Sequence, residues 1–278
     1  MLVPAKTENR NRCEERIAMS ISTTVTVKAH SKTVEFDTVI NNTPKDHRVR
    51  MIFPTELSGD EYFASQAFCF VKRKRGVTAE GINYREPESY EKNTSGIIGV
   101  SSGENKFYFV GKEGFHEAGV YPDGTISVTM FRGFGREFHE KNSKSAQLNG
   151  KLTFSYAVCI DDSNLFDIQK KISEKAVSYM CKGELKPVNN MVSLEYGNAE
   201  VSVIKPAENN SGWIVRLFNP TSKIITDVAK INIPDVEVYE TNLEEKEQSK
   251  NLLSNNTVNV CIEPYKIKTF AVRKINKN

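Results

Sequence analysis

Val34-Glu35-Phe36-Asp37-Thr38-Val39-Ile40 alternates its side chains between two faces, and after the turn Asn41-Asn42-Thr43-Pro44-Lys45-Asp46-His47 the alternation resumes in Arg48-Val49-Arg50-Met51-Ile52-Phe53. Successive side chains of a β-strand point to opposite faces of the sheet, so this pattern predicts two strands, each with one buried face. Similar segments, bounded by Gly, Pro, Asn and Asp, occur at residues 23–29, 68–71, 106–110, 125–131 and 152–160. Residues 21–162 are therefore predicted to form one large antiparallel β-sandwich.

One segment has a different period. Ser163 can cap a helix that runs to about Tyr179, because Leu165, Ile168 and Ile172 recur at helical spacing. A polar connector follows the helix. Residues 163–187 are therefore predicted to be a helix and linker that join two β domains.

Short strands are predicted again beyond the linker, at residues 192–195, 201–204, 213–218, 229–233, 236–239, 258–262 and 267–272. This number of strands in about 90 residues is typical of a small immunoglobulin-like β-sandwich, which we expect over residues 188–278. Trp213 is expected in its core, and the charged residues 244–250 are expected to form an exposed loop. The predicted fold class is all-β, with a single helix.

The first 20 residues carry Asn, Arg and Glu without any periodicity. Such a segment is expected to be disordered at the end of a domain. A lead-in truncated from a larger protein is the other interpretation of residues 1–20.

Charge and cysteine content limit the class of protein and its compartment. The net charge of +3 is the balance of 38 basic and 35 acidic residues, which is too even for a nucleic-acid surface. The five cysteines are scattered and lack metal-ligand spacing. This pattern is typical of unpaired thiols in a reducing compartment. The chain has no apolar run long enough for a membrane span and no signal-peptide core. We expect a cytoplasmic protein without nucleic-acid or membrane partners.

Motifs that carry catalysis are lacking. The sequence contains no Ser or Cys nucleophile elbow, no Gly-rich phosphate loop and no His-rich metal motif. Its four histidines lie far apart in the chain. We predict no catalytic residue, no metal ligand and no cofactor in this chain.

Several short motifs nevertheless follow one another in a familiar order, at residues 35–42, 45–50, 114–117, 126–132, 146–150, 203–206 and 214–219. In this order they resemble the β region that follows the catalytic domain in family 38 glycoside hydrolases, the α-mannosidases. The resemblance extends over most of the chain. It implies a galactose-mutarotase-like supersandwich followed by the small C-terminal sandwich.

The resemblance also implies which part of such an enzyme is missing. In this family an N-terminal barrel holds a zinc ion, bound by Asp and His side chains, and a carboxylate nucleophile. Retaining hydrolysis of a mannoside needs two carboxyl groups about 5 Å apart. Nothing in this sequence matches the zinc or nucleophile motifs, so the chain is expected to be an inactive fragment of a retaining α-mannosidase. Its implied partners are the zinc-holding catalytic barrel, whose cleft it would support and partly shape, and the mannoside substrate.

Five charged or titratable residues are candidates for the rim of that carbohydrate cleft: Asp46, His47, Arg48, Glu117 and Arg132. A structural interpretation competes with this one. Asp46 can accept backbone N–H bonds, and Arg48 and Arg50, two residues apart on one face, can pair with carboxylates of neighbouring strands.

Two other functions stay open. A stand-alone carbohydrate-binding module would bind sugars with exposed aromatic side chains. A complete enzyme on a mutarotase-like sandwich would use His47 or His116 with a carboxylate as acid and base. Linkage, aglycone and the formation of a homo-oligomer are also left open by the sequence.

Overall fold

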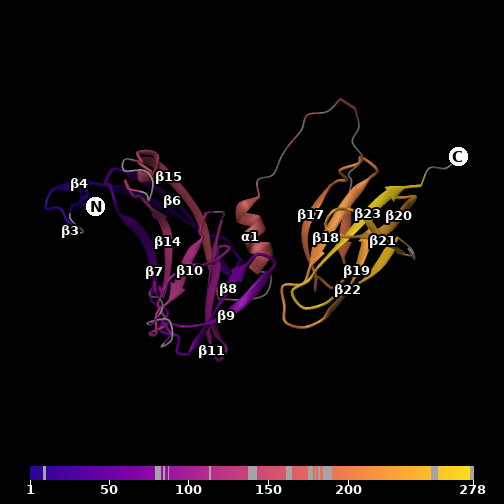
Figure 1. Cartoon of the computed structure of the whole chain (residues 1–278), viewed down its shortest axis with the longest axis horizontal. Helices are drawn as coiled ribbons and strands as arrows, with labels where there is room; N and C mark the ends of the chain where they lie inside the picture. Colours follow the sequence, from indigo (N-terminus) through magenta and orange to yellow (C-terminus); the bar gives the residue numbers. More distant parts are fainter. Residues whose placement is uncertain are drawn as a thin grey trace. The chain divides into compact units, whose positions relative to one another are not determined.

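The structure is a computed structural model that describes residues 1–8, 11–78, 83, 85–86, 88–112, 114–136, 143–160, 165–174, 178, 180, 182–183, 190–251 and 256–275. It divides into two compact units (Figure 1). The first contains residues 1–66 and 71–176, and the second contains residues 67–70 and 177–278. Both are built from antiparallel sheets, which confirms the predicted all-β architecture.

The first unit is organised around a seven-stranded sheet. In spatial order its strands are β5 (Ser20–Val27), β6 (Thr33–Asn42), β15 (Gly150–Cys159), β12 (Asn105–Gly111), β11 (Ile97–Ser102), β8 (Glu61–Gln66) and β9 (Cys69–Lys74). The longest pairing joins β6 and β15 over ten residues, from Asn42 opposite Gly150 to Thr33 opposite Cys159. This pairing connects parts of the chain that are more than a hundred residues apart in sequence.

A four-stranded sheet supplies the second layer of this unit. It consists of β10 (Lys92–Asn93), β13 (Glu117–Val120), β14 (Ile126–Arg132) and β7 (Arg48–Phe53), in that order. The inner faces of the two sheets pack one core, in which Ile40 and Phe109 of the large sheet and Val128 of the small sheet are no more than 1% exposed. The alternation seen in the sequence is therefore the alternation between this core and the outer faces.

The helix α1 (Leu165–Ser173) belongs to the first unit and packs against β12 and β15 (Figure 1). Leu165 is buried, and the Gln169 side-chain amide donates hydrogen bonds to the carbonyls of Ser95, at 2.9 Å, and Gly111, at 3.1 Å. The predicted cap Ser163 and the predicted end at Tyr179 lie outside the described residues.

The lead-in differs from its expected disorder. β1 (Leu2–Pro4) pairs with β4 (Arg16–Ala18), and β2 (Thr7–Glu8) pairs with β3 (Asn11–Arg12). Met19 is only 1% exposed and joins the core of the first unit. Strands of two or three residues are too short to show a period in the sequence, so the pattern gave no sign of them.

The second unit is a sandwich of a three-stranded and a five-stranded sheet. The first contains β16 (Val192–Leu194), β19 (Ile225–Ile231) and β22 (Thr257–Ile262); the second contains β17 (Glu200–Pro206), β18 (Trp213–Phe218), β23 (Ile267–Lys274), β20 (Val236–Thr241) and β21 (Glu247–Asn251). Their facing apolar side chains form a separate core that includes Val215, Leu217 and Val260.

Two expectations for this unit were wrong. Most of the predicted loop 244–250 is the edge strand β21, which pairs with β20 although its sequence is polar, because an edge strand buries little surface. Trp213 is half-buried, with the Lys274 ammonium 6.0 Å from its ring centroid, because it lies near the end of its strand. No helix in the described ranges is long and apolar enough to cross a membrane.

Asn219 is fully buried directly after β18 and joins the segment that follows β18 to the end of β22. Its amide nitrogen donates to the carbonyls of Lys223, Ile262 and Glu263, at 2.7, 3.0 and 3.1 Å. Its amide oxygen accepts from the backbone N–H and the hydroxyl of Thr221. A buried polar group of this kind stabilises a fold only while all its partners are satisfied.

We expect Asn219→Ala to lower the free energy of unfolding of the second unit by about 2–3 kcal/mol, because it leaves buried carbonyls without a donor. Trp213 is the one tryptophan of the chain, so urea denaturation followed by its fluorescence reports on this unit. The exposed control Asn259→Ala should change the same quantity by less than about 0.5 kcal/mol. Equal effects of the two substitutions would contradict the role given to Asn219.

Candidate functional site

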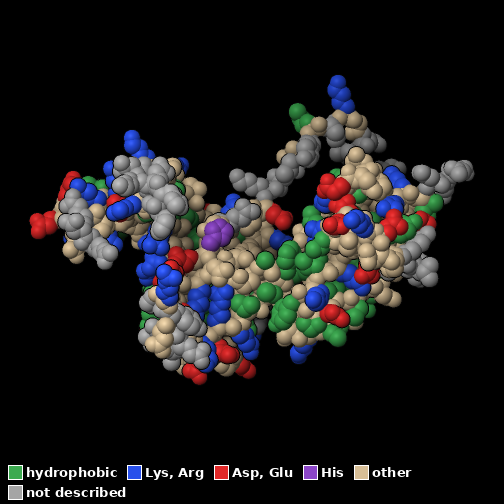
Figure 2. Space-filling view, in the orientation of Figure 1, with side chains coloured by type: hydrophobic (Ala, Val, Ile, Leu, Met, Phe, Trp, Pro, Cys, Tyr) green, Lys and Arg blue, Asp and Glu red, His purple; other side chains and the backbone are tan. Residues whose placement is uncertain are grey.

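The five candidate rim residues lie at one end of the four-stranded sheet. Asp46, His47 and Arg48 lead into β7, Arg132 ends β14 directly opposite Arg48, and Glu117 begins β13. Basic and acidic side chains gather over this sheet on the face seen in Figure 2. The fold thus brings together side chains from three separate parts of the sequence.

Asp46 is fixed in the turn before β7 by hydrogen bonds to the side-chain amide of Gln147. One carboxylate oxygen accepts hydrogen bonds from the backbone N–H of Gly135, at 2.7 Å, and from the side-chain nitrogen of Gln147, at 2.8 Å. The amide oxygen of Gln147 in turn accepts from the backbone N–H of Asp46, at 2.9 Å. The prediction that Asp46 accepts a backbone N–H bond is therefore confirmed. Its φ of +54° is tolerated because Asp is among the few residues with a side chain that visit this region.

Glycines allow the chain to approach Gln147 so closely. A Cβ atom on Gly133 would lie 2.7 Å from the Gln147 carbonyl oxygen, and one on Gly135 would lie 2.5 Å from its side-chain nitrogen. No real Cβ atom tolerates such distances. The backbone contact requires glycine at position 133, and a side chain at position 135 would displace the Gln147 amide from Asp46.

His47 points inward rather than to solvent. Its ring meets Phe131 edge to face, with centroids 5.3 Å apart, and within the described residues neither buried ring nitrogen has a hydrogen-bond partner. Burial lowers the pKa of His47, and the positive charge of Arg12 lowers it further. The imidazole is thus stabilised in its neutral form as part of the packing.

Arg48 and Arg50 both pair with carboxylates, as their shared face predicts. Arg48 lies 3.1 Å from a carboxylate oxygen of Glu117 and 4.0 Å from one of Glu91, and Arg50 lies 2.9 Å from Glu91. Tyr121 joins them, because its hydroxyl accepts from Arg50 and donates to Glu91. These groups form a continuous network across the outer face of the sheet.

The Glu91 carboxylate is the buried centre of this network, with only 4% of its side chain exposed. Burial alone would raise its pKa, but hydrogen bonds, including one from Ser127, and the charges of Arg50 and Arg48 together lower it. Glu91 therefore keeps its negative charge although it is buried. Removing one partner from such a site leaves an uncompensated buried charge.

Arg132 differs from the other candidates. It is exposed, and among the described residues no carboxylate pairs with it, although it lies opposite Arg48 across the β7–β14 pair. Like charges in directly opposite positions of a sheet repel each other. Within the described residues, Arg132 is thus the one of the five candidates that is exposed and has no carboxylate partner.

The arrangement offers groups that can recognise a polar ligand. It offers guanidinium donors and a half-exposed Glu117 carboxylate, which suit hydroxyl groups or an anion. In the described part of the chain no group of three or more His, Cys, Asp or Glu side chains could hold a metal ion. Neither His47 nor His116 is hydrogen-bonded to a carboxylate within that part.

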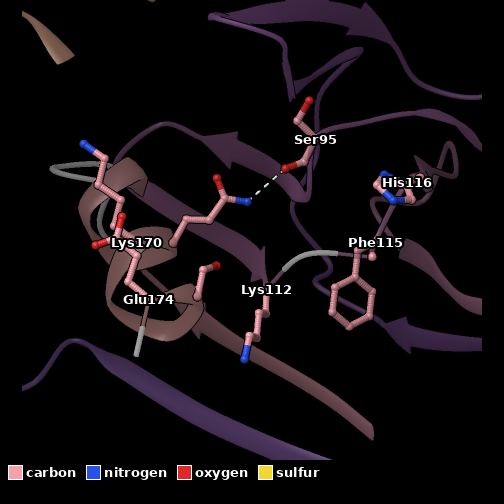
Figure 3. A pocket seen from close by; sticks show the side chains of 9 residues that line it. Ser95, Lys112, Phe115, His116, Lys170 and Glu174 are labelled. Atoms are coloured by element: carbon pink, nitrogen blue, oxygen red, sulfur yellow. Dashed lines mark hydrogen bonds between the residues drawn. The ribbon is translucent and has the colours of Figure 1, made fainter. Parts of the chain in front are cut away.

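A separate open pocket of about 390 Å³ lies beside α1 in the first unit. Lys170 of α1 and Glu174, which follows α1, lie on one side of it, and Phe115 and His116 lie on the other (Figure 3). Lys112 lies between these two groups (Figure 3). The remaining lining residues are Ser95, Gly114, Gln169 and Ser173. Amide, hydroxyl and charged groups around one aromatic ring suit a small polar ligand.

Comparison with known proteins finds a family whose description matches part of the second unit. Residues 198–270 match the family described as "Glycosyl hydrolases family 38 C-terminal beta sandwich domain". The predicted resemblance to this region of family 38 is confirmed. The match lies within the three-stranded and five-stranded sheets described above.

Longer relatives extend the likeness to the first unit. Over 269 residues the chain is 21% identical to "Putative mannosylglycerate hydrolase" of Halalkalibacterium halodurans, with 93% of this chain and 29% of the relative covered. An α-mannosidase from Enterococcus faecalis V583 shares its fold, with a TM-score of 0.79, 22% identity, and 98% of this chain and 32% of that chain covered. A glycosyl hydrolase family 38 protein from Enterococcus faecalis gives a TM-score of 0.76, with 22% identity, 98% of this chain and 34% of that chain covered. The chain thus spans about a third of the length of these relatives.

Sequence reasoning missed two residues on which the rim depends. Glu91 lies in a stretch without clear alternation, so nothing in the sequence marked it as the partner of Arg50. Gln147 lies in the motif at residues 146–150, but a lone Gln does not indicate a partner that is about a hundred residues away in sequence. Asp46 and Gln147 are joined only by the fold.

The lowered pKa of His47 makes a prediction about pH. The unfolded chain binds a proton near the ordinary pKa of 6.5, whereas the folded chain resists it, so stability falls as the pH drops below 6.5. We expect the fall in the free energy of unfolding between pH 7.5 and 5.5, measured by urea denaturation and circular dichroism, to be smaller in His47→Gln than in the wild type. An equal fall in both proteins would show that His47 does not carry this dependence.

Proposed function

We propose that this chain is the C-terminal β region of an α-mannosidase and that it supports and partly shapes the carbohydrate cleft of a catalytic barrel. The observation that carries the proposal is the match of residues 198–270 to the family 38 C-terminal domain. The coverage of only 29% of the Halalkalibacterium relative supports it, because the remaining residues of that relative offer room for a catalytic domain. Zinc and the nucleophile would belong to that domain.

The contacts of the five candidate residues support different roles for them in this proposal. Asp46 and His47 would act as positioning residues, since one is bonded to Gln147 and the other is packed on Phe131. Arg132 and the Arg48–Glu117 pair would reach the substrate or the barrel, since they lie on the outer face. The four cysteines that the structure describes are free thiols, which supports a cytoplasmic setting for the assembly.

The purified chain should not hydrolyse an aryl α-mannoside, with zinc or cobalt added, because the retaining reaction needs the nucleophile of the barrel. Release of the phenol can be followed by absorbance. Turnover clearly above the background of a heat-denatured sample would overturn the proposal.

A hybrid enzyme tests the rim itself. This chain can replace the matched 29% of the Halalkalibacterium relative, and Arg132→Ala in the hybrid should lower kcat/KM about tenfold, or about 1.4 kcal/mol. Lys230→Ala, at an exposed position on β19 of the second unit, serves as the control and should leave kcat/KM unchanged. A hybrid whose activity is indifferent to Arg132 would remove this residue from the cleft.

The pocket beside α1 favours a second function, binding of a small carbohydrate by the chain alone. Its hydroxyl, amide and lysine groups can bind sugar hydroxyls. This interpretation requires no barrel.

Titration calorimetry with methyl α-mannoside separates this second function from the first. Saturable heat with the wild type that disappears in Lys112→Ala, but persists with the exposed control Lys144→Ala, would support binding in the pocket. Absence of heat up to millimolar sugar would exclude the pocket as a mannoside site and leave the supporting role.

A further inference from the structure

The two edges of the seven-stranded sheet are built differently. β5, Ser20-Ile21-Ser22-Thr23-Thr24-Val25-Thr26-Val27, lies at one edge and contains no charged residue over its eight positions. In the described structure only β6 pairs with it along this length. A long, uncharged edge strand of this kind is a template for pairing with another chain.

The opposite edge is protected. β9 carries Lys72, Arg73 and Lys74 in succession, a basic cluster whose simplest interpretation is a solvated strand end. Lysines on an edge strand are the usual means by which proteins prevent pairing between sheets. The same sheet therefore guards one edge with charge and leaves the other without it.

The side chains of β5 are divided cleanly between its faces. Ile21, Thr23, Val25 and Val27 continue the inner face, because Ile21 lies opposite the buried Ile40, while the other face carries only Ser and Thr hydroxyls. Ile21, Val25 and Val27 are nevertheless 44%, 55% and 71% exposed. The apolar inner face thus extends beyond the part that the rest of the unit covers.

We propose that β5 pairs with β5 of a second copy of this chain, antiparallel about a two-fold axis at Thr24. In this register Ile21 lies opposite Val27, and Thr23 lies opposite Val25. Hydroxyl-bearing residues meet on the other face, where Ser22 lies opposite Thr26. Lys28, which is paired with Glu35 in its own chain, falls opposite Ser20, so no like charges oppose each other.

This pairing produces a closed dimer and cannot continue to a third copy. A two-fold contact uses the same surface on both chains, so the dimer consumes the uncharged edge of each large sheet. The edges that then remain on the joined sheet are the two β9 strands with their lysines. The joined sheet contains fourteen strands, seven from each copy.

The position of Thr24 on the axis allows a sharp test. The wild type should have twice the chain mass of 31.3 kDa in light scattering coupled to size-exclusion chromatography. Thr24→Lys and Thr24→Glu should each be monomers, because each places two like charges opposite one another. An equal mixture of the two variants should recover a dimer, because Lys then faces Glu.

The control is Thr226→Lys, an exposed strand position of the second unit, which should remain a dimer. Circular dichroism shows whether each variant is folded. A wild-type monomer up to about 100 μM, or a Thr24→Lys dimer, would overturn the proposal. Two monomeric variants that fail to associate when mixed would exclude the two-fold register at Thr24.

Discussion

The pairing of β6 with β15 is the constraint on which the first unit depends. Ten residues of each strand are in register, so the end of β6 at Asn42 is fixed opposite Gly150. The Asn42 side chain then donates to the carbonyls of Gln147 and Leu148, which fixes the segment that precedes β15. Gln147 is thereby placed against the turn at Asp46. The register of a single strand pair thus determines the position of Gln147 beside Asp46.

Much of the fold was predictable because alternation is a local property of the sequence. The strand Arg48–Phe53 was predicted to the residue, and the shared face of Arg48 and Arg50 followed from its period of two. What could not be predicted is which carboxylate those arginines meet. Glu91 becomes their partner only when the sheet order places it there, and a single sequence contains no information about that order.

The candidate site was predictable as a location but not as a set of roles. Asp46, His47 and Arg48 are adjacent in sequence, yet the first bonds to an amide, the second packs inward and the third forms ion pairs outward. All three are ionisable residues of one short segment, but the fold places each of them in a different environment. The inward turn of His47 follows from the strand period, which places it next to the outward-facing Arg48.

The buried carboxylate of Glu91 affects the net charge that the arginines at this end of the sheet present to an approaching molecule. Arg48 and Arg50 are balanced by Glu91 and Glu117, whereas no carboxylate within the described residues pairs with Arg132. Because the pKa of Glu91 is held below its ordinary value, the negative charge of Glu91 persists further into acidic solution than that of an ordinary Glu. In a cell such a charge is felt over roughly 8 Å, the screening length at physiological ionic strength. The charge of Arg132 therefore acts on an approaching molecule only at short range.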